Sequence, residues 1–484
     1  MIELVIPVII YFMPVKYDAI VVGSGPNGLA AAITLQQRGH SVLLIEGKEQ
    51  VGGGLRTSEL TLPGFHHDVC SAIHPMAIHS PFLASLPLAD FGLEYIHPSI
   101  AAAHPFDGGG AAYVTHSLED TASALGKDGQ VYSDLIGPVV EDWPFIISNI
   151  LAPLRFPGHP FKLAKFGLKA LRSASAIAKQ FSTKEGKGLW AGMAAHSIQP
   201  LTNASTAAIG LVLSAAAHIR GWPMARGGSQ SIANAMAAYF KHLGGTIQTG
   251  HWVHLVDELP EARALVFDVT PVQLLKIAGH RFTSFYRSQL QRYRYGMGVF
   301  KIDWALSGPI PFVSEPSRKA ATVHLGATFE EIALSESDAS SGKLANKPFV
   351  LLAQQSLLDA SRAPGGQHTA WGYCHVPNGS VVDMTGMIEA QVERFAPGFK
   401  DLILARHTLN AQQMETYNPN YIGGDINGGI IDIRQLYTRP SLSLTPYRTS
   451  DKQIYICSSS TPPGGGVHGM CGYHAAQTIL KDLF

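Results

Sequence analysis

The chain has 484 residues, which corresponds to about three domain-sized units of ~150 residues, and its 36 basic and 36 acidic residues cancel to a net charge of zero. Nucleic-acid binding usually requires a basic excess that neutralises phosphates, so the balance argues against such a partner. Charged residues make up only 15% of the chain, against roughly 25% in an average soluble domain, which predicts large apolar faces.

The first segment, residues 1–14 (MIELVIPVIIYFMP), is apolar but short. Crossing a bilayer takes about 20 apolar residues, and Pro7 interrupts this run without a small-residue cleavage site after it. We interpret the segment as a swapped strand or as residues ahead of a start at Met13. A weak membrane anchor is the third interpretation. No other stretch has the composition of a membrane span, so we expect a cytoplasmic protein, with peripheral membrane contact as an alternative.

A nucleotide-binding pattern follows directly. Residues 17–23 (YDAIVVG) form an apolar, β-branched run typical of a buried strand, and residues 29–39 (LAAAITLQQRG) have the composition of a helix that ends at a glycine. A second buried strand, residues 41–45, leads to Glu46. Strand, glycine loop, helix, strand and acid in this order predict a dinucleotide-binding unit whose loop consists of Gly23, Ser24, Gly25, Pro26, Asn27 and Gly28.

Each part of this loop has a physical role. Gly23 permits the tight turn, Gly25 lets the backbone approach a pyrophosphate, and Gly28 allows the helix to pack close to the sheet. The helix amino terminus offers unpaired N–H groups and partial positive charge to phosphates. Glu46 can accept hydrogen bonds from ribose hydroxyls, and its charge repels the 2′-phosphate of NADP.

A second glycine-rich stretch, residues 51–57 (VGGGLRT), distinguishes FAD from NAD. It resembles the second glycine motif of glutathione-reductase-type and amine-oxidase-type flavoproteins, in which two glycines precede an arginine and then a serine or threonine. In this chain Gly54 follows Gly53 at the position where those flavoproteins have the arginine. The arginine of this chain, Arg56, lies two residues further on, and Thr57 occupies the expected serine or threonine position. We expect the guanidinium near the pyrophosphate or the flavin edge. The alternative is an ordinary glycine-rich surface turn.

Two later segments complete the predicted site. Residues 227–253 contain GGSQ, a helix and a strand-like stretch, and the resemblance to this flavoprotein superfamily implies that the backbone of Val253 contacts adenine. The alternative is an ordinary helix–strand unit. Residues 458–472 (SSSTPPGGGVHGMCG) precede a closing helix with one apolar face, and its amino terminus would stabilise negative charge at flavin N1 and the C2 carbonyl. The residues expected there are Gly465, Gly466, Val467 and His468.

Together with GFHHDVCSAIHP (64–75) and GGDINGG (423–429), these motifs resemble the phytoene desaturase-related family of FAD-dependent oxidoreductases, in the branch of pyridine nucleotide-disulfide oxidoreductase domain-containing proteins. The resemblance covers nearly the whole chain. It implies an α/β fold with a Rossmann-like FAD-binding domain built from discontinuous segments and an inserted α+β substrate domain. The expected FAD-binding segments are 17–75, 219–280 and 423–484, and the substrate domain combines a helical part, 76–218, with a mixed sheet, 281–422.

Two further predictions concern the inserted residues 140–220 and the connection between HWVHLV and VFDVTP. Residues 140–220 are helix-rich and apolar, and Lys162, Lys165, Lys169 and Arg172 have a spacing compatible with one helical face that would suit an anionic lipid surface. A solvated face over an ordinary core is the alternative. The strand hairpin usual in the family between HWVHLV and VFDVTP is nearly absent, with only DELPEARA between them.

The chemistry of a flavin enzyme requires the substrate over N5 and in some cases a base, for which histidine is suited near neutral pH. His66, His67, Asp68 and His74 follow the second glycine motif, and His468 lies in the expected flavin loop. We take His67, His74 and His468 as catalytic candidates, although each has a structural hydrogen-bonding role as its alternative. The cysteines form no CxxC pair and no zinc spacing, so we expect non-covalent FAD, free thiols and no metal site; Cys471 alone raises a covalent link.

The predicted function is an FAD-dependent oxidoreductase that dehydrogenates or desaturates an apolar polyene, lipid-like or alicyclic substrate by hydride transfer to N5. Oxygen or a quinone would reoxidise the flavin. The alternatives are a flavin-dependent isomerase of the carotenoid-isomerase type, an amine oxidase-like enzyme, in which Tyr421 or Tyr473 would supply part of an aromatic pair, and a non-catalytic flavin-binding partner protein. The substrate and the oligomeric state are left open.

Overall fold

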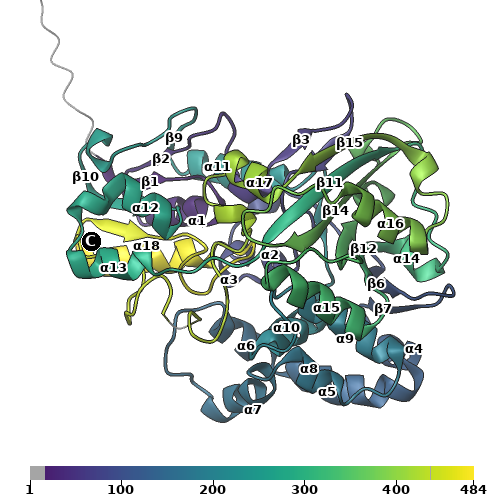
Figure 1. Cartoon of the computed structure of the whole chain (residues 1–484). Coiled ribbons are helices and arrows are strands. Elements are labelled where there is room, and N and C mark those ends of the chain that lie inside the picture. The colour runs from purple at the N-terminus through teal and green to yellow at the C-terminus, as the bar shows by residue number, and fades with distance from the viewer. Residues whose placement is uncertain (1–16, 437) are drawn as a thin grey trace, which may run out of the picture.

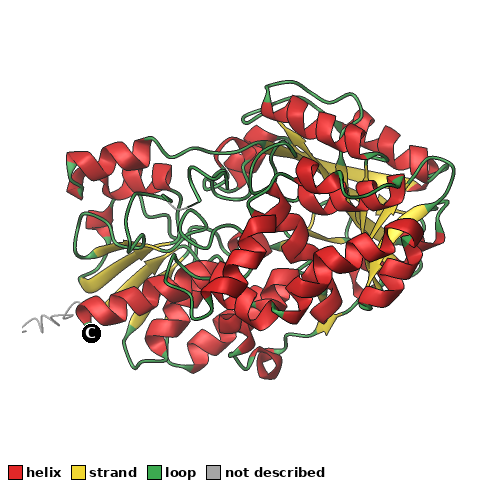
Figure 2. Ribbon diagram, turned by 90° about the horizontal axis from the view of Figure 1, so that it is seen from below, coloured by secondary structure: helices red, strands yellow, loops and turns green. Residues whose placement is uncertain are grey.

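Two sheets organise the chain. The structure is a computed structural model that describes residues 17–436 and 438–484. A five-stranded sheet and a seven-stranded sheet lie at opposite ends of the molecule, with helices around and between them (Figures 1 and 2). The apolar segment 1–14 lies outside the described residues, and the interpretations offered for it stay predictions.

The five-stranded sheet is parallel throughout. Four of its strands are largely buried apolar runs, as a parallel sheet with both faces covered requires, whereas the edge strand β9 is mostly exposed. In the order β16-β10-β1-β2-β9, the strands are β16 (Ile454–Ile456), β10 (Ala262–Phe267), β1 (Tyr17–Val22), β2 (Val42–Ile45) and β9 (Thr246–Gln248). Three distant stretches of the chain therefore build one sheet.

Helices cover both faces of this sheet. One face packs against α1 (Pro26–Gln36), α11 (Gln230–His242) and α18 (Met470–Leu483), and the other against α12 (Pro271–Ala278) and α13 (Ser284–Gln291). The contact between α1 and α18 is close, since a Cβ on Gly472 would lie 1.8 Å from the carbonyl oxygen of Asn27. Residues 249–261, where the hairpin was expected to be absent, hold only the turn Val256–Glu258 and no strand.

The seven-stranded sheet is mixed, with β12 and β6 as its parallel pair. In the order β15-β11-β14-β13-β12-β6-β7, its strands are β15 (Ile403–Leu409), β11 (Gly298–Leu306), β14 (His368–Val376), β13 (Val350–Ala353), β12 (Ala320–Leu325), β6 (Ile100–Pro105) and β7 (Ala111–Thr115). Alternate residues face opposite sides. One side forms a core with α16 (Thr385–Phe395), and the other faces the five-stranded sheet and the helical region.

The segment expected to be helical is only partly so. Residues 76–218 contain α4 (Leu118–Ala124), α5 (Gly129–Glu141), α6 (Trp143–Ile150), α7 (Pro160–Ala170), α8 (Ala174–Ala178), α9 (Lys184–Ala195) and α10 (Thr206–Arg220). They also contain β6 and β7, which extend the mixed sheet. The expectation was wrong on this point because β6 (IAAAHP) is rich in alanine and carries no strand alternation.

Short elements connect these layers: β3 (Thr57–Glu59), β4 (His66–Asp68), α2 (Pro75–His79), α3 (Pro81–Ala84), β5 (Tyr95–Ile96), β8 (Met224–Ala225), α14 (Glu315–Lys319), α15 (Phe329–Ser340) and α17 (Ala411–Tyr417). None of the helices in the described part of the chain has both the length and the apolar character that crossing a bilayer requires.

Candidate functional site

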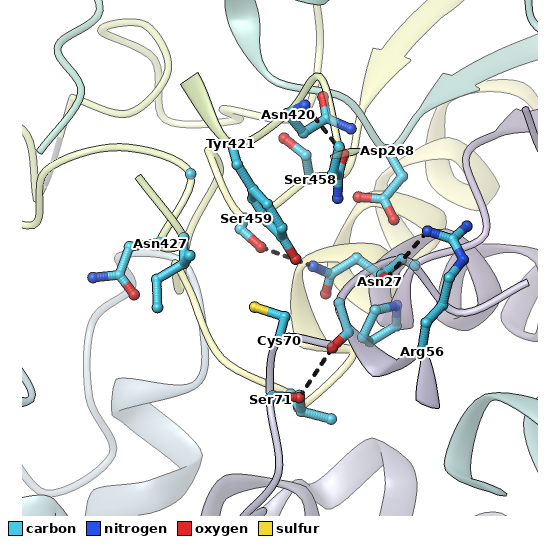
Figure 3. A pocket seen from close by; sticks show the side chains of 18 of the residues that line it. Asn27, Arg56, Cys70, Ser71, Asp268, Asn420, Tyr421, Asn427, Ser458 and Ser459 are labelled. Carbon is cyan, nitrogen blue, oxygen red and sulfur yellow. Dashed lines mark hydrogen bonds between the residues drawn. The ribbon is translucent and has the colours of Figure 1, made fainter. Parts of the chain in front are cut away.

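A cavity of about 460 Å³ lies between the two sheets and takes its walls from both. The carboxyl ends of β1, β2 and β10 supply one part, and the inner face of the seven-stranded sheet, with α2 and α10, supplies the other. Figure 3 shows the labelled side chains that reach this space from segments far apart in sequence. Ligands of open parallel sheets bind outside the carboxyl ends of the strands, which is where this cavity lies.

The glycine loop forms the first part of the wall. Gly23, Gly25, Pro26 and Asn27 line the cavity at the amino terminus of α1. A Cβ on Gly25 would lie 2.8 Å from the carboxylate of Asp268, so this position has room for bare backbone only. Gly28 does not line the cavity; a Cβ there would lie 1.9 Å from the carbonyl oxygen of Gly23, which is the close helix packing expected of it.

Glu46 lies at the end of β2 and also lines the cavity. One carboxylate oxygen accepts a 3.0 Å hydrogen bond from the backbone N–H of Ser24, and the other pairs with the guanidinium of Arg56 at 3.0 Å. Arg56 donates further bonds to the carbonyls of Gln50 and Gly53, so it holds the second glycine turn against Glu46.

The remaining residues of the second glycine motif separate into two groups. Gly53 and Gly54 line the cavity, where Gly53 approaches the Cα of Gly25. Thr57 does not line it: its hydroxyl donates to Asp68 at 2.8 Å and accepts from the backbone N–H of Gln230 at 3.1 Å. Thr57 therefore ties the motif to α11.

The two later segments both contribute to the cavity wall. Val253 lines the cavity beside Glu46, and Gly466 and Val467 line it beside the C-terminal segment. Asn27 of the first loop donates a 3.5 Å hydrogen bond to Ser459, a contact visible in Figure 3. Gly465 packs against Asn427 and is not part of the wall.

These residues fit an extended dinucleotide. An acid that can accept from ribose, a helix amino terminus for phosphates and bare glycine backbone at both loops line one continuous space. The fit rests on the close approaches at Gly25 and Gly53, which any side chain would fill.

The other part of the cavity is mainly apolar. Its polar members include His74, His196 and Thr322. Its apolar and aromatic members come from the helical side and from alternate positions of β13 and β14: Ile73, Met76, Ile198, Leu213, Trp222, Leu351, Ala353, Trp371 and Tyr373. His196 and His324 share a hydrogen bond of 3.0 Å between their Nε2 atoms, and burial lowers the pKa of His196 to about 3.

The three candidate histidines occupy different environments. His74 lines the cavity, with Nε2 2.8 Å from the hydroxyl of Ser229. His67 lies outside the wall, between Thr61 and Asp303. His468 also lies outside it, and its Nδ1 accepts a hydrogen bond from the N–H of Met470 at the start of α18. Burial lowers the pKa of all three to about 4, so each is neutral at pH 7.

His67 and His468 do not line the cavity, and their catalytic roles stay predictions. The contacts of both side chains are structural ones: His468 accepts from the N–H of Met470 at the start of α18, and His67 bonds to Thr61 and lies 3.7 Å from Asp303 of β11. Cys471 does not line the cavity, and its sulfur faces the carbonyls of Thr461 and Gly464. Burial raises the pKa of its thiol to about 12, so the thiol stays protonated at pH 7. All four cysteines are free thiols.

Of the two tyrosines considered as an aromatic pair, only Tyr421 lines the cavity. Its hydroxyl lies over Gly54, and Figure 3 shows its ring near Cys70. Tyr473 packs against Phe82 instead. Trp371 and Tyr373, whose rings meet edge-on at 5.1 Å, supply the other aromatic wall.

Sequence reasoning missed Asp268. It follows β10 directly, lines the cavity and accepts a 2.9 Å hydrogen bond from the N–H of Gly28. Burial raises its pKa to about 7, with Glu46 adding to the rise and the Gly28 N–H opposing it. The sequence feature that could have identified Asp268 is its position directly after an apolar run typical of a buried parallel strand.

Comparison with known proteins supports the same family. Residues 21–84 match the model of the NAD(P)-binding Rossmann-like domain. The chain is 24% identical to mouse (Mus musculus) pyridine nucleotide-disulfide oxidoreductase domain-containing protein 2, over 97% of this chain and 94% of the relative. It is 23% identical to a lycopene-forming phytoene desaturase of Paracoccus sp., over 97% and 98% respectively.

A solved oxidoreductase of Methanosarcina mazei has a similar fold, with a TM-score of 0.66, 15% sequence identity, and coverage of 96% of this chain and 100% of that one. The expected resemblance and the α/β fold with a Rossmann-like domain are thus confirmed. The relatives named above thus include a desaturase and a protein with an oxidoreductase domain.

Proposed function

We propose that this protein is an FAD-dependent oxidoreductase that dehydrogenates an apolar substrate. The observation that carries the proposal is the single cavity that joins the glycine loop at Gly25 to an apolar wall at Leu351 and Trp371. A nucleotide that extends along the glycine-lined part would end beside the apolar part, so cofactor and substrate would share one cavity.

The wall offers a partner for each part of the cofactor. Val253 would contact adenine, Glu46 the ribose hydroxyls, and the amides at the start of α1 the diphosphate. Gly466 and Val467, ahead of α18, would lie against the ring system. A bound flavin supplies an acceptor for two electrons and a hydride.

Dehydrogenation removes a hydride and a proton, and the protein's own residues favour a reaction in which the hydride leaves carbon first and the resulting substrate cation then loses its proton to water or to a weak base such as His74. His74 is neutral at pH 7 but has a pKa lowered to about 4, which makes it a weak base. Burial raises the pKa of Tyr373 and of Tyr421, so both phenols keep their protons. The apolar side chains exclude water and position a substrate of similar polarity.

An amine substrate is less well supported. The carboxylates that line the cavity among the described residues are Glu46 and Asp268, and both lie beside the glycine loop. An ammonium in the apolar part would have no carboxylate partner there, and burying an unpaired charge is unfavourable. A flavin isomerase would use the same residues, and a non-catalytic partner protein would use only the cofactor part.

The test begins with the colour of the purified protein. We expect an absorption band of bound flavin that bleaches when an apolar substrate is added without oxygen and returns with oxygen or a quinone. Activity that appears only after prior reduction would identify the isomerase, and colour without bleaching by any polyene, lipid or alicyclic compound would favour the partner protein.

Glu46→Ala should lose most of the flavin, whereas Glu49→Ala, an exposed acid nearby, should retain it. Full occupancy in Glu46→Ala would refute the assignment.

A further inference from the structure

Three polar atoms in the apolar part of the cavity wall have no hydrogen-bond partner. They are Nδ1 of His74, Oγ1 of Thr322 and Nε1 of Trp371, on side chains that are 1%, 4% and 7% exposed. Buried polar groups in folded proteins are nearly always paired, with protein, water or ligand. Three unpaired groups on one mainly apolar wall therefore indicate that something polar pairs with them.

The sheet places two of these groups on one row. Thr322 of β12 lies opposite Ala353 of β13, and Ala353 lies opposite Trp371 of β14. Neighbouring strands are about 4.8 Å apart, so the row spans roughly 10 Å, with the small Ala353 in its middle. Ala72 and Ile73 pack against Ala353 and Trp371, which brings the segment that ends in His74 against this row.

The hydrogen bonds of Ser229 determine which nitrogen of His74 carries the proton. The Ser229 hydroxyl donates its single hydrogen to the carbonyl of Ser71 at 2.5 Å, so it can only accept from Nε2 of His74 at 2.8 Å. Because burial lowers the pKa of His74 to about 4, the ring is neutral and its proton is on Nε2. Nδ1 is then a free acceptor.

The indole N–H of Trp371 can only donate a hydrogen bond, and Nδ1 of His74 can only accept one. The hydroxyl of Thr322 can do both. A hydrocarbon would leave all of them unpaired, and a carbonyl would leave His74 unpaired. A hydroxyl group can accept from Trp371 or Thr322 and donate to His74. We propose, as an extension of the proposed function, that the substrate is an apolar alcohol whose hydroxyl binds at the row Thr322–Ala353–Trp371 opposite His74.

The test uses the full-length protein with its bound flavin and the indole N–H signals of its six tryptophans in a ¹⁵N–¹H NMR spectrum. Trp371→Phe identifies the signal of Trp371. Matched probes of one skeleton are then titrated: tert-butylcyclohexane, 4-tert-butylcyclohexanol and 4-tert-butylcyclohexanone, and likewise farnesene and farnesol. We expect the alcohols to move the Trp371 signal and to bind roughly 10- to 100-fold more tightly than the matched hydrocarbons.

Variants locate the hydroxyl. Thr322→Val keeps the shape of the side chain and should weaken alcohol binding while leaving hydrocarbon binding unchanged or tighter. His74→Leu should do the same. The control is Leu351→Val, which reshapes the same wall without changing a polar atom and should affect both probes of a pair equally. No movement of the Trp371 signal with any alcohol up to its solubility limit, or equal affinity for alcohol and hydrocarbon, would overturn the proposal.

The outcome is separable from that of the proposed function, because the flavin content of the same preparation reports on the cofactor alone. A protein that holds flavin but prefers the hydrocarbons would refute only the alcohol. A protein without flavin that still binds the alcohols at Trp371 would refute only the oxidoreductase.

Discussion

Asp268 lies beneath the glycine loop, where its carboxylate accepts the N–H of Gly28 at the start of α1. This N–H belongs to the helix end that would also attract the phosphates of a nucleotide. A carboxylate in that place competes with an anionic ligand unless it is protonated. The raised pKa, about 7, means that the neutral form is accessible near physiological pH.

Asp268 should also give the stability of the protein a measurable pH dependence. Its pKa is about 7 when folded and 3.8 in the unfolded reference, so between these values the folded chain holds a proton that the unfolded chain releases. The free energy of unfolding should therefore fall as pH rises through this window, by at most about 1.4 kcal/mol per pH unit. Asp268→Asn should remove this contribution.

Urea unfolding at pH 5, 6 and 7 checks the prediction. The buried histidines, such as His74, titrate in the opposite direction but are common to both proteins, so the difference between wild type and Asp268→Asn isolates Asp268. Parallel pH profiles of the two proteins would contradict the assignment.

At the scale of single elements, α7 and the loop before it project from the lower edge of the molecule in Figure 1. Four apolar side chains there are strongly exposed: Leu154 by 68%, Phe156 by 90%, Phe161 by 89% and Leu168 by 77%. Of the basic residues expected to share one face, Lys162 pairs with Asp142 and Lys169 donates to the carbonyl of Asp134. Exposed apolar and aromatic side chains on an element that also carries lysines are typical of a surface that inserts at a lipid interface.

We propose that this surface binds anionic lipid. Vesicles of phosphatidylcholine with phosphatidylserine should sediment the protein, and Phe156→Ser with Phe161→Ser should weaken binding by about tenfold or more, since each phenylalanine contributes on the order of 1.5–3 kcal/mol when buried. Leu334→Ser on α15, also 62% exposed, is the control and should bind like the wild type. Equal loss in both variants, or no sedimentation of the wild type, would reject the surface.

The elements also show what could be predicted from sequence. The glycine loop, the acid at position 46 and the helix between them are close in sequence, so local spacing predicted their arrangement. Thr322, Leu351 and Trp371 lie on three strands and become neighbours only through the register of the sheet. No local pattern reveals register, so the apolar wall was not predicted. The position of His468 outside the cavity lining was not predicted either, because a place in a loop does not determine where a side chain points.

At the scale of the whole molecule, Asp68 and Arg362 connect two halves. Asp68 ends β4, which follows the second glycine motif, and Arg362 lies between β13 and β14 of the seven-stranded sheet. They pair at 2.8 Å with both side chains about 1% exposed, and Asp68 also accepts from Thr57 and from the N–H of Ser229. Burial alone would raise the pKa of Asp68, but the Arg362 guanidinium and these N–H and O–H donors outweigh it and lower the pKa.

Arg362→Met should therefore leave a buried carboxylate without its main partner and reduce the free energy of unfolding by about 3–5 kcal/mol, measured by urea denaturation. The control is Arg226→Met, which removes an exposed ion pair with Glu94 and should change stability far less. Addition of Asp68→Asn to Arg362→Met should recover part of the loss. Similar effects of the two single substitutions would show that the buried pair does not join the halves.

The strand order of the parallel sheet bears on how the protein is made. β10 lies between β1 and β16, and β16 (Ile454–Ile456) is translated last. On the ribosome, the nascent sheet therefore keeps an open apolar edge at β10 while the later strands of the mixed sheet, β11 to β15, emerge. Such an unpaired edge is prone to aggregation, so we expect newly synthesised chains to depend on chaperones until the final strand is released.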